Sequence, residues 1–421
     1  MIRIGTIWTL VVVALLAGVC AVAAQQDETA PPELPPIEEI EEQSGYIYDP
    51  ATDTYIPRPQ PDTSVFVPMD FDFRIGVVGD YIKEVPTAGG VQTQVKTPLI
   101  LIDPRNGDIG VYAKNFPARI VTHSDNGNWV VGVAESSSVE GSSGSRQREC
   151  AVSLDMNEGD IEIIQEFPLF SKFQAYFTPT DDNAILYCVN EPAVVNSLVR
   201  YNLRNKEEEL LPTEGNRFYL YGLKQDDPRG IWVEDPFSVA DYPVVNLVNW
   251  ENGTNLDKVK FPGSSYIVPS PMGDVILAVV ENRAEASIGY YKLSDHSFHQ
   301  VPNLVLTRPT VKWAHTAMAV IAKESTATRD RFLWIDLETG NVQEIWSDYF
   351  KIAYWDISPE DDALVFIIDS ETEPVLYVVP LDQSIGAINC IRLTDVSNVS
   401  WIGCLSPPRG GGSWLDRLLP F

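Results

Sequence analysis

The sequence contains little cysteine, little histidine and few basic residues. Its 421 residues include five cysteines and four histidines, and so few cysteines in so long a chain do not build a disulfide framework. Thirty basic residues stand against 59 acidic ones, which gives a formal charge of -29. Because such a charge repels phosphate backbones, nucleic-acid binding is excluded from the leading functions.

Long hydrophobic runs are confined to the N-terminus. Residues 1–24 combine Arg3, the apolar run LVVVALLAGVCAV and the small-residue end AVAA, a pattern typical of a signal peptide cleaved near Ala23 or Ala24. We therefore expect a periplasmic or secreted protein with no integral membrane segment in its mature chain. Two alternatives remain open, an uncleaved N-terminal anchor and a lipoprotein attached through Cys20.

Residues 25–44 form an acidic, proline-rich linker. The segment QQDETAPPELPPIEEIEEQS has seven acidic residues, four prolines and no basic residue. Proline cannot donate to a strand ladder and like charges repel, so we expect an extended, solvated spacer. The alternative is a docking peptide for a basic partner.

The remaining residues, 45–421, lack apolar residues at helical spacing and predict a single all-β domain that ends in a glycine-rich tail over 409–421. A Ser/Thr-centred turn recurs at Ser124, Thr178, Ser270, Ser358 and Ser406, with gaps of 54, 92, 88 and 48 residues. These gaps are one or two copies of a period of about 47 residues. Each copy holds four short strand patterns, which is typical of the stacked blades of a β-propeller.

The repeats resemble the TolB-like or WD-type propeller repeat. In that repeat a strand leads into Ser-Pro-Asp-Gly, and an apolar strand, a polar corner and another strand follow. Ser358, Pro359 and the strand 363–368 match it, as do Ser270 and Pro271. The resemblance covers about residues 63–407 and implies a propeller without the N-terminal α/β domain of TolB, so TolB's partners do not carry over.

The two ends of the repeat region leave unused strands. Residues 44–59 form a spare hairpin, and residues 397–415 a spare inner strand pair. If these segments share one blade, the ring closes between the termini and no sheet edge is left bare. We therefore favour eight four-stranded blades with termini-shared closure, and seven blades with an accessory hairpin are the alternative.

No catalytic constellation emerges from the pattern. His123, His296 and His299 are expected at structural or surface positions, whereas His315 lies in a predicted inner strand and is our candidate for the channel. The Ser/Gly stretch 139–147 does not fit a nucleophile elbow and is expected to be a flexible loop. We expect no catalytic residue, no metal site and no cofactor.

An acidic or amide corner follows the predicted second strand of successive units. Loops between second and third strands open on one face of a propeller, so these carboxylates are expected to surround one mouth. The members are Asp80, Glu135, Glu191, Glu234, Asp235, Glu281, Glu324 and Asp369. They are either turn residues of the repeat or an acidic ring that attracts a cationic partner or Ca²⁺.

Cys150 and Cys188 lie in neighbouring units and form the one disulfide that the spacing makes plausible, with buried thiols as the alternative. Taken together, the intact repeats predict an exported, non-catalytic propeller that binds a protein or cell-envelope component. This partner is basic if the acidic ring takes part in binding. A polysaccharide lyase or hydrolase and a lectin-like sugar binder are the alternatives. An enzyme should bring polar side chains from several blades together in the channel.

Overall fold

A computed structural model describes most of the chain. The described residues are 46–49, 54–57, 66–67, 69–87, 90–96, 99–112, 119–124, 127–178, 181–190, 198–211, 218–222, 229–234, 244–249, 255–261, 264–270, 275–282, 285–326, 329–348, 351–368, 374–382, 388–394, 396–405 and 418–419. The predicted signal peptide, the acidic linker and nearly all of the glycine-rich tail therefore lie outside them. Two units are distinguished, residues 1–59 and residues 60–421.

The first unit contains one hairpin. Its strands β1 (Tyr46–Asp49) and β2 (Thr54–Pro57) pair antiparallel. They form a two-stranded sheet of their own in the part of the chain that the structure describes.

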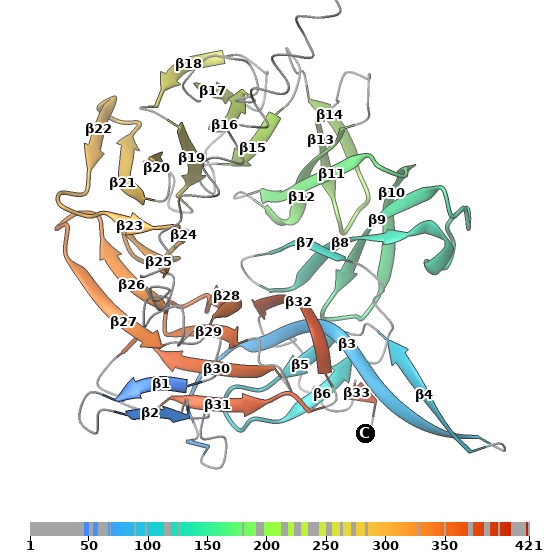
Figure 1. The fold of residues 1–421 in the computed structure, drawn as a ribbon. Coiled ribbons are helices and arrows are strands. Elements are labelled where there is room, and N and C mark those ends of the chain that lie inside the picture. The colour runs from blue at the N-terminus through green and yellow to red at the C-terminus, as the bar shows by residue number, and fades with distance from the viewer. Residues whose placement is uncertain are drawn as a thin grey trace, which may run out of the picture. The chain divides into compact units, whose positions relative to one another are not determined.

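The second unit is built from antiparallel sheets arranged as a ring, in which successive sheets follow the chain (Figure 1). The second sheet comprises β7 (Arg119–His123), β8 (Trp129–Glu135), β9 (Arg148–Asp155) and β10 (Ile161–Pro168). The third comprises β11 (Lys172–Thr178), β12 (Asp181–Asn190), β13 (Leu198–Asn202) and β14 (Glu208–Leu211). The fourth comprises β15 (Phe218–Gly222), β16 (Arg229–Glu234), β17 (Val244–Asn249) and β18 (Asn255–Lys260).

The remaining sheets complete the ring. The fifth comprises β19 (Ser264–Pro269), β20 (Val275–Asn282), β21 (Glu285–Lys292), β22 (Ser297–Gln300) and the short β23 (Leu306–Thr307). The sixth comprises β24 (Thr310–Trp313), β25 (Ala319–Ser325), β26 (Asp330–Asp336) and β27 (Val342–Asp348). The seventh comprises β28 (Ile352–Ile357), β29 (Ala363–Ile368), β30 (Val375–Pro380) and β31 (Asn389–Arg392). A short 3₁₀ turn, Ser136–Ser138, follows β8.

The first sheet joins the two ends of this unit. Its order is β32 (Val396–Leu405), β3 (Arg74–Thr87), β5 (Leu99–Ile102), β6 (Ile109–Tyr112) and β33 (Leu418–Leu419), and β4 (Gly90–Lys96) forms a hairpin with β3. The C-terminal strand β32 is thus the inner strand of the sheet that the N-terminal strands begin. The ring of sheets therefore closes through a C-terminal strand, as the spare strand near residue 400 predicted.

The partner of the C-terminal strand differs from our favoured arrangement. We expected residues near 399–404 to share an eighth blade with the hairpin at 46–57, but β32 pairs with β3, Ile402 opposite Val77. The described strands of the second unit form seven such sheets. Met69, Phe71 and Phe73, directly before β3, are buried but form no strand, and β32 takes the inner position beside β3.

The core consists of apolar layers between successive sheets rather than one central mass. Between the sixth and seventh sheets, for example, Phe332 and Phe366 lie with ring centroids 5.2 Å apart. Both strand faces are buried in β29, where all six residues are buried. The sequence of such a strand is a continuous apolar run, and each sheet needs its two neighbouring sheets to bury its apolar faces.

Candidate functional site

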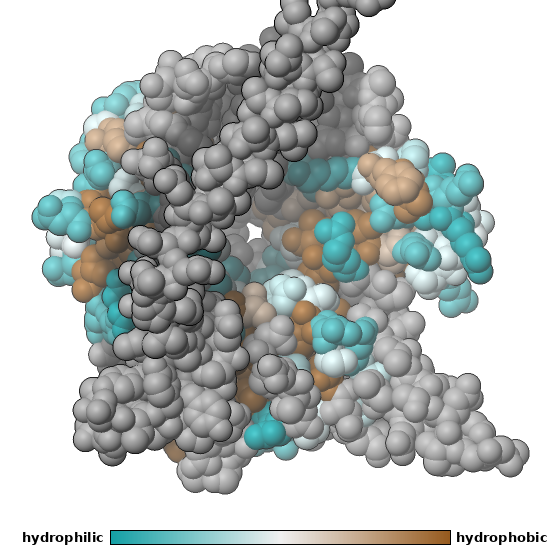
Figure 2. All heavy atoms as spheres, in the orientation of Figure 1, coloured by the Kyte–Doolittle hydropathy of each residue, from teal (hydrophilic) through white to brown (hydrophobic). Residues whose placement is uncertain are grey.

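The first strands of the sheets line the centre of the ring, and Figure 2 shows an opening among the atoms there. Charged side chains from several sheets meet at Asp356, near the end of β28. Lys312 of β24 places its Nζ 2.6 Å from Asp356 Oδ1, and His123 of β7 places its Nε2 3.5 Å from Oδ2. The backbone N–H of Cys404 in β32 donates to the same Oδ2 at 2.7 Å. We call these four residues the Asp356 cluster.

Burial makes the Asp356 cluster a strong set of interactions. Asp356 is only 6 % exposed, so an unpaired carboxylate at this position would be costly. Burial alone would raise its pKa, but the charge of Lys312 and the hydrogen bond and charge of His123 hold the pKa of Asp356 far below its ordinary value. The carboxylate is therefore ionised throughout the physiological range.

The pKa of His123 is shifted in the opposite direction, upward. Burial alone would lower its pKa, yet its hydrogen bond to Asp356 and the charge of that carboxylate raise the pKa of His123 overall. Its Nδ1 lies 3.2 Å from the carbonyl oxygen of Ser124. The nearby thiol of Cys404 is buried, and burial, followed by the charge of Asp356, raises its pKa, which makes this thiol a poor nucleophile.

Two tryptophans hold the cluster from its sides. The ammonium of Lys312 lies 5.2 Å from the ring centroid of Trp355, a cation–π geometry. Trp401 meets His123 edge-on at 5.8 Å. The indole of Trp401 also covers Gly403, where an added Cβ would come within 2.2 Å of the ring. A glycine at that position is thus required by the close approach of the indole.

Most described members of the predicted acidic ring lie at the ends of second strands, whereas Asp80 lies within the long strand β3, opposite Ser397, and the members differ in exposure. Glu135 and Glu281 are exposed, and Asp80 is half-buried with its Oδ2 accepting a hydrogen bond from Asn398 at 2.9 Å. Glu234 is the last residue of β16. Glu191, Asp235 and Asp369 lie outside the described residues.

Glu324 differs from the expectation because it is only 4 % exposed. Its Oε1 accepts a hydrogen bond from the N–H of Thr307 at 2.8 Å, and its Oε2 pairs with Arg331. These partners hold the short strand β23 against the sixth sheet. Glu324 is therefore structural and offers no carboxylate to a partner.

His315 also differs from the expectation. It lies after the end of β24, in the turn to β25, and its backbone N–H donates to Asp361 Oδ1 at 2.8 Å. The histidine at the centre of the ring is His123 instead. The sequence hides this because β7 carries a bulge between Ile120 and Thr122, which changes the direction in which the next residues point.

The expected Cys150–Cys188 disulfide is not formed, since Cys150 is a free, buried thiol. Cys150 packs with Val78 and Leu99 in the layer between the first and second sheets. The layer that the second sheet shares with β12 contains Ala151 instead. Cys150 therefore faces away from the strand that carries Cys188.

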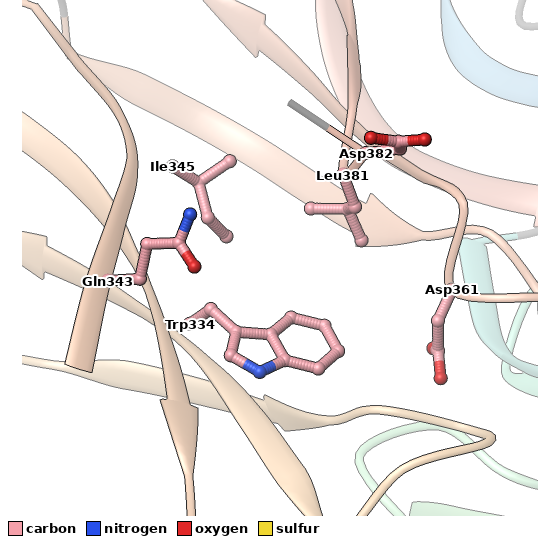
Figure 3. A pocket seen from close by; sticks show the side chains of 6 residues that line it. All are labelled: Trp334, Gln343, Ile345, Asp361, Leu381 and Asp382. Carbon is pink, nitrogen blue, oxygen red and sulfur yellow. The ribbon is translucent and has the colours of Figure 1, made fainter. Parts of the chain in front are cut away.

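A groove of about 240 Å³ lies between the sixth and seventh sheets. Figure 3 shows Trp334, Gln343 and Ile345 on one side, and Asp361, Leu381 and Asp382 on the other. Both Asp361 oxygens already accept hydrogen bonds, from His315 N–H and from Thr316. Within the described residues, the side-chain amide of Gln343 has no hydrogen-bond partner.

Comparison with known proteins finds no matching protein-family model and no matching curated sequence. Solved structures do match. An oligogalacturonate lyase in complex with manganese is 13% identical, with 81% of this chain and 97% of that one covered and a TM-score of 0.51. The fold is a β-propeller.

Two further solved structures match this chain. A functionally unknown protein from Desulfotomaculum acetoxidans is 11% identical, with 80% and 100% of the two chains covered and a TM-score of 0.50. TolB from Acinetobacter baumannii is 12% identical, with 86% and 78% covered and a TM-score of 0.46. The propeller fold predicted from the repeats is confirmed by the two matches with TM-scores of 0.51 and 0.50. No helix among the described residues is both long and apolar enough to cross a membrane.

Proposed function

We propose that this protein is an exported, non-catalytic β-propeller that binds a protein or cell-envelope component. The observation that carries this proposal is the saturation of the Asp356 cluster. Polar groups of four sheets do converge at the centre of the ring, but Lys312, His123 and the Cys404 N–H satisfy both oxygens of Asp356. A carboxylate so deeply paired is a poor general base and holds inner strands together instead.

The loop face is the proposed binding surface. It is the face reached by the loops between second and third strands, where Glu135 and Glu281 are exposed. With a chain charge of -29, this face favours a basic partner and speeds its approach. Each exposed contact is worth only about 1 kcal/mol or less, so the carboxylates must act together.

The test is a charge-neutral variant of the loop face. Glu135→Gln, Glu281→Gln and Asp80→Asn, made together, should slow association with the partner that co-purifies from the host by roughly tenfold at low salt. An octalysine peptide serves as a reference polycation. The matched control is Glu158→Gln with Glu338→Gln and Glu360→Gln, three exposed carboxylates in turns of the opposite face. Equal rates for both variants would reject electrostatic capture by the loop face.

A second candidate function, sugar binding, is favoured by the groove at Trp334. An indole surface, a side-chain amide that both donates and accepts, and a neighbouring carboxylate are suited to a sugar ring, whose faces are apolar and whose rim is hydroxylated. The volume of about 240 Å³ is below the roughly 300–1,000 Å³ of pockets for drug-sized ligands, so a single ring is the fitting size.

Titration with neutral and amino monosaccharides, followed by tryptophan fluorescence, tests this candidate. Trp334→Ala should abolish a saturable signal, and Gln343→Ala should weaken the affinity about tenfold by removing the hydrogen bonds. A signal that persists in Trp334→Ala would place any sugar elsewhere. The absence of saturable binding would reject the groove as a sugar site.

A further inference from the structure

The connection from β10 to β11 exposes two apolar side chains to solvent. In the loop that begins at Pro168, Leu169 is 36% exposed and Phe170 is 87% exposed. Phe170 is the most exposed of the large apolar residues that the structure describes. Burial of a phenylalanine is strongly favourable in water, so an almost fully exposed ring leaves that free energy unused within the chain.

The backbone of Phe170 is also unfavourable for its residue type. Its φ is 72°, in the left-handed region that glycine and asparagine adopt readily and bulky residues avoid. The turn is held by hydrogen bonds from Leu169 N to Gln147 O at 2.9 Å and from Ser171 N to Pro168 O at 3.2 Å. The chain thus holds an almost fully exposed aromatic residue in a strained turn.

The loops around the tip carry small, polar and charged side chains of both signs, with Arg146 and Lys172 exposed as well as Glu140. In the neighbouring serine-rich loop, side chains bond to the loop's own backbone, from Ser138 Oγ to Glu135 O at 2.7 Å and from Ser142 Oγ to Val139 O at 2.9 Å. Ser143 N–H donates to Glu166 Oε1. An aromatic anchor inside a polar rim is the usual composition of a binding hot spot.

The tip lies on the face already proposed for binding. The β10–β11 connection leads from the last strand of one sheet to the first strand of the next, and such connections open on the same face as the loops after second strands. Glu135 and Glu140 are exposed in the loop after the second strand β8 of that same sheet. Since the chain charge is -29, an anionic lipid surface would be repelled, whereas a basic protein would be attracted.

We propose that Phe170 and Leu169 are the apolar anchor of this face and insert into an apolar pocket, flanked by lysine or arginine, on a partner protein. This inference rests on the proposed function, since it names the chemistry of the partner held by the loop face. The carboxylates guide the partner in, and the anchor slows its release.

A photo-crosslinking amino acid, p-benzoylphenylalanine, placed at position 170 of the full chain in its host tests the anchor. We expect one protein to be crosslinked through residues of an apolar pocket with basic neighbours, at a yield well above that for the same probe at position 298. Phe298 is the matched control because it is 38% exposed but lies on the outer strand β22. Crosslinks to lipid, to a second copy of this chain, or at equal yield from both positions would overturn the proposal.

The purified partner then gives the quantitative test. Phe170→Ser should weaken its binding at least tenfold, mainly through faster dissociation, whereas Phe170→Trp and Phe298→Ser should leave it unchanged. Phe170→Gly separates binding from folding, because it should raise the melting temperature by relieving the positive φ while still weakening binding. If Phe170→Ser binds as the unaltered chain does, the anchor is wrong. If it binds weakly but the charge-neutral variant and salt have no effect, the anchor stands and electrostatic capture is wrong.

Discussion

The side-chain amide of Asn389 forms hydrogen bonds with both the N–H and the carbonyl group of Val67. Its Oδ1 accepts a hydrogen bond from Val67 N at 2.9 Å, and its Nδ2 donates to Val67 O at 2.7 Å. Asn389 is fully buried and so imitates the neighbouring strand that the segment before β3 lacks. It ties the start of the second unit to β31 of the seventh sheet.

Asn389→Ala should lower the free energy of unfolding by about 2 kcal/mol. The substitution removes two hydrogen bonds, and the exposed backbone of Val67 regains water on one side only. Denaturant unfolding measures the loss, with Asn205→Ala, an exposed turn residue, as the control. An unchanged midpoint would show that this contact is not important for stability.

Asp356→Asn should destabilise the protein by about 3 kcal/mol at pH 7. The neutral amide cannot compensate for the charge of Lys312. Its Nδ2 is a hydrogen-bond donor, and the groups that contact both oxygens of Asp356 are donors as well. Chemical denaturation measures the change, and Glu158→Gln in an exposed turn should have almost no effect. A loss below about 0.5 kcal/mol, the range of ordinary surface substitutions, would contradict a structural role for this cluster.

His123 should make stability depend on pH in a definite direction. Its folded pKa is raised, so its protonated form contributes stability that is complete below the unfolded pKa of about 6.5 and is lost as the pH rises through the folded pKa. The stability difference between the unaltered chain and His123→Gln should therefore be larger at pH 5.5 than at pH 8.5.

Unfolding curves at both pH values check this prediction. In the background of Asp356→Asn the same comparison should lose its pH dependence, because the carboxylate that raises the pKa is gone. A difference that grows with pH would mean that the neutral imidazole is the stabilising form.

Removal of residues 1–57 should leave the melting temperature of the second unit within about 2 °C of its original value. The hairpin β1–β2 forms its own sheet, and β32 supplies the inner strand of the first sheet. Calorimetry of the shortened chain measures this. A drop of many degrees would restore the composite blade that the spare strands suggested.

The repeat predicted the fold because its turns use the same chemistry each time. Ser358 illustrates it, since its Oγ accepts hydrogen bonds from the N–H groups of Asp362 and Ala363 at 3.0 and 2.9 Å. The seven-sheet arrangement was harder to predict. Alternating apolar and acidic residues over 69–73 suit a strand, but the segment runs directly into β3 without a turn, so the inner strand beside β3 comes from the far end of the chain.

The Asp356 cluster contains a signal that the repeat could have revealed. Ala314 and Ser358 hold equivalent turn positions, since their N–H groups donate to Ala319 O and Ala363 O. Lys312 and Asp356 stand two positions before them, as Cys404 stands two positions before the turn residue Ser406. Aligned on the turn, these positions point to one place, and a lysine in one unit beside an aspartate in the next predicts an ion pair. His123 falls out of this alignment because of the bulge in β7.

The pairing of β3 with β32 also sets the order of events during synthesis. Ser400 bonds to Val78 across a separation of 322 residues, so β3 leaves the ribosome long before its partner exists. Until β32 arrives, the first sheet presents a bare inner edge that invites pairing with other chains. Contacts this distant in sequence form slowly, which makes ring closure the late step of folding. A translation product that ends before residue 396 cannot close its ring and would be exposed to aggregation and proteolysis.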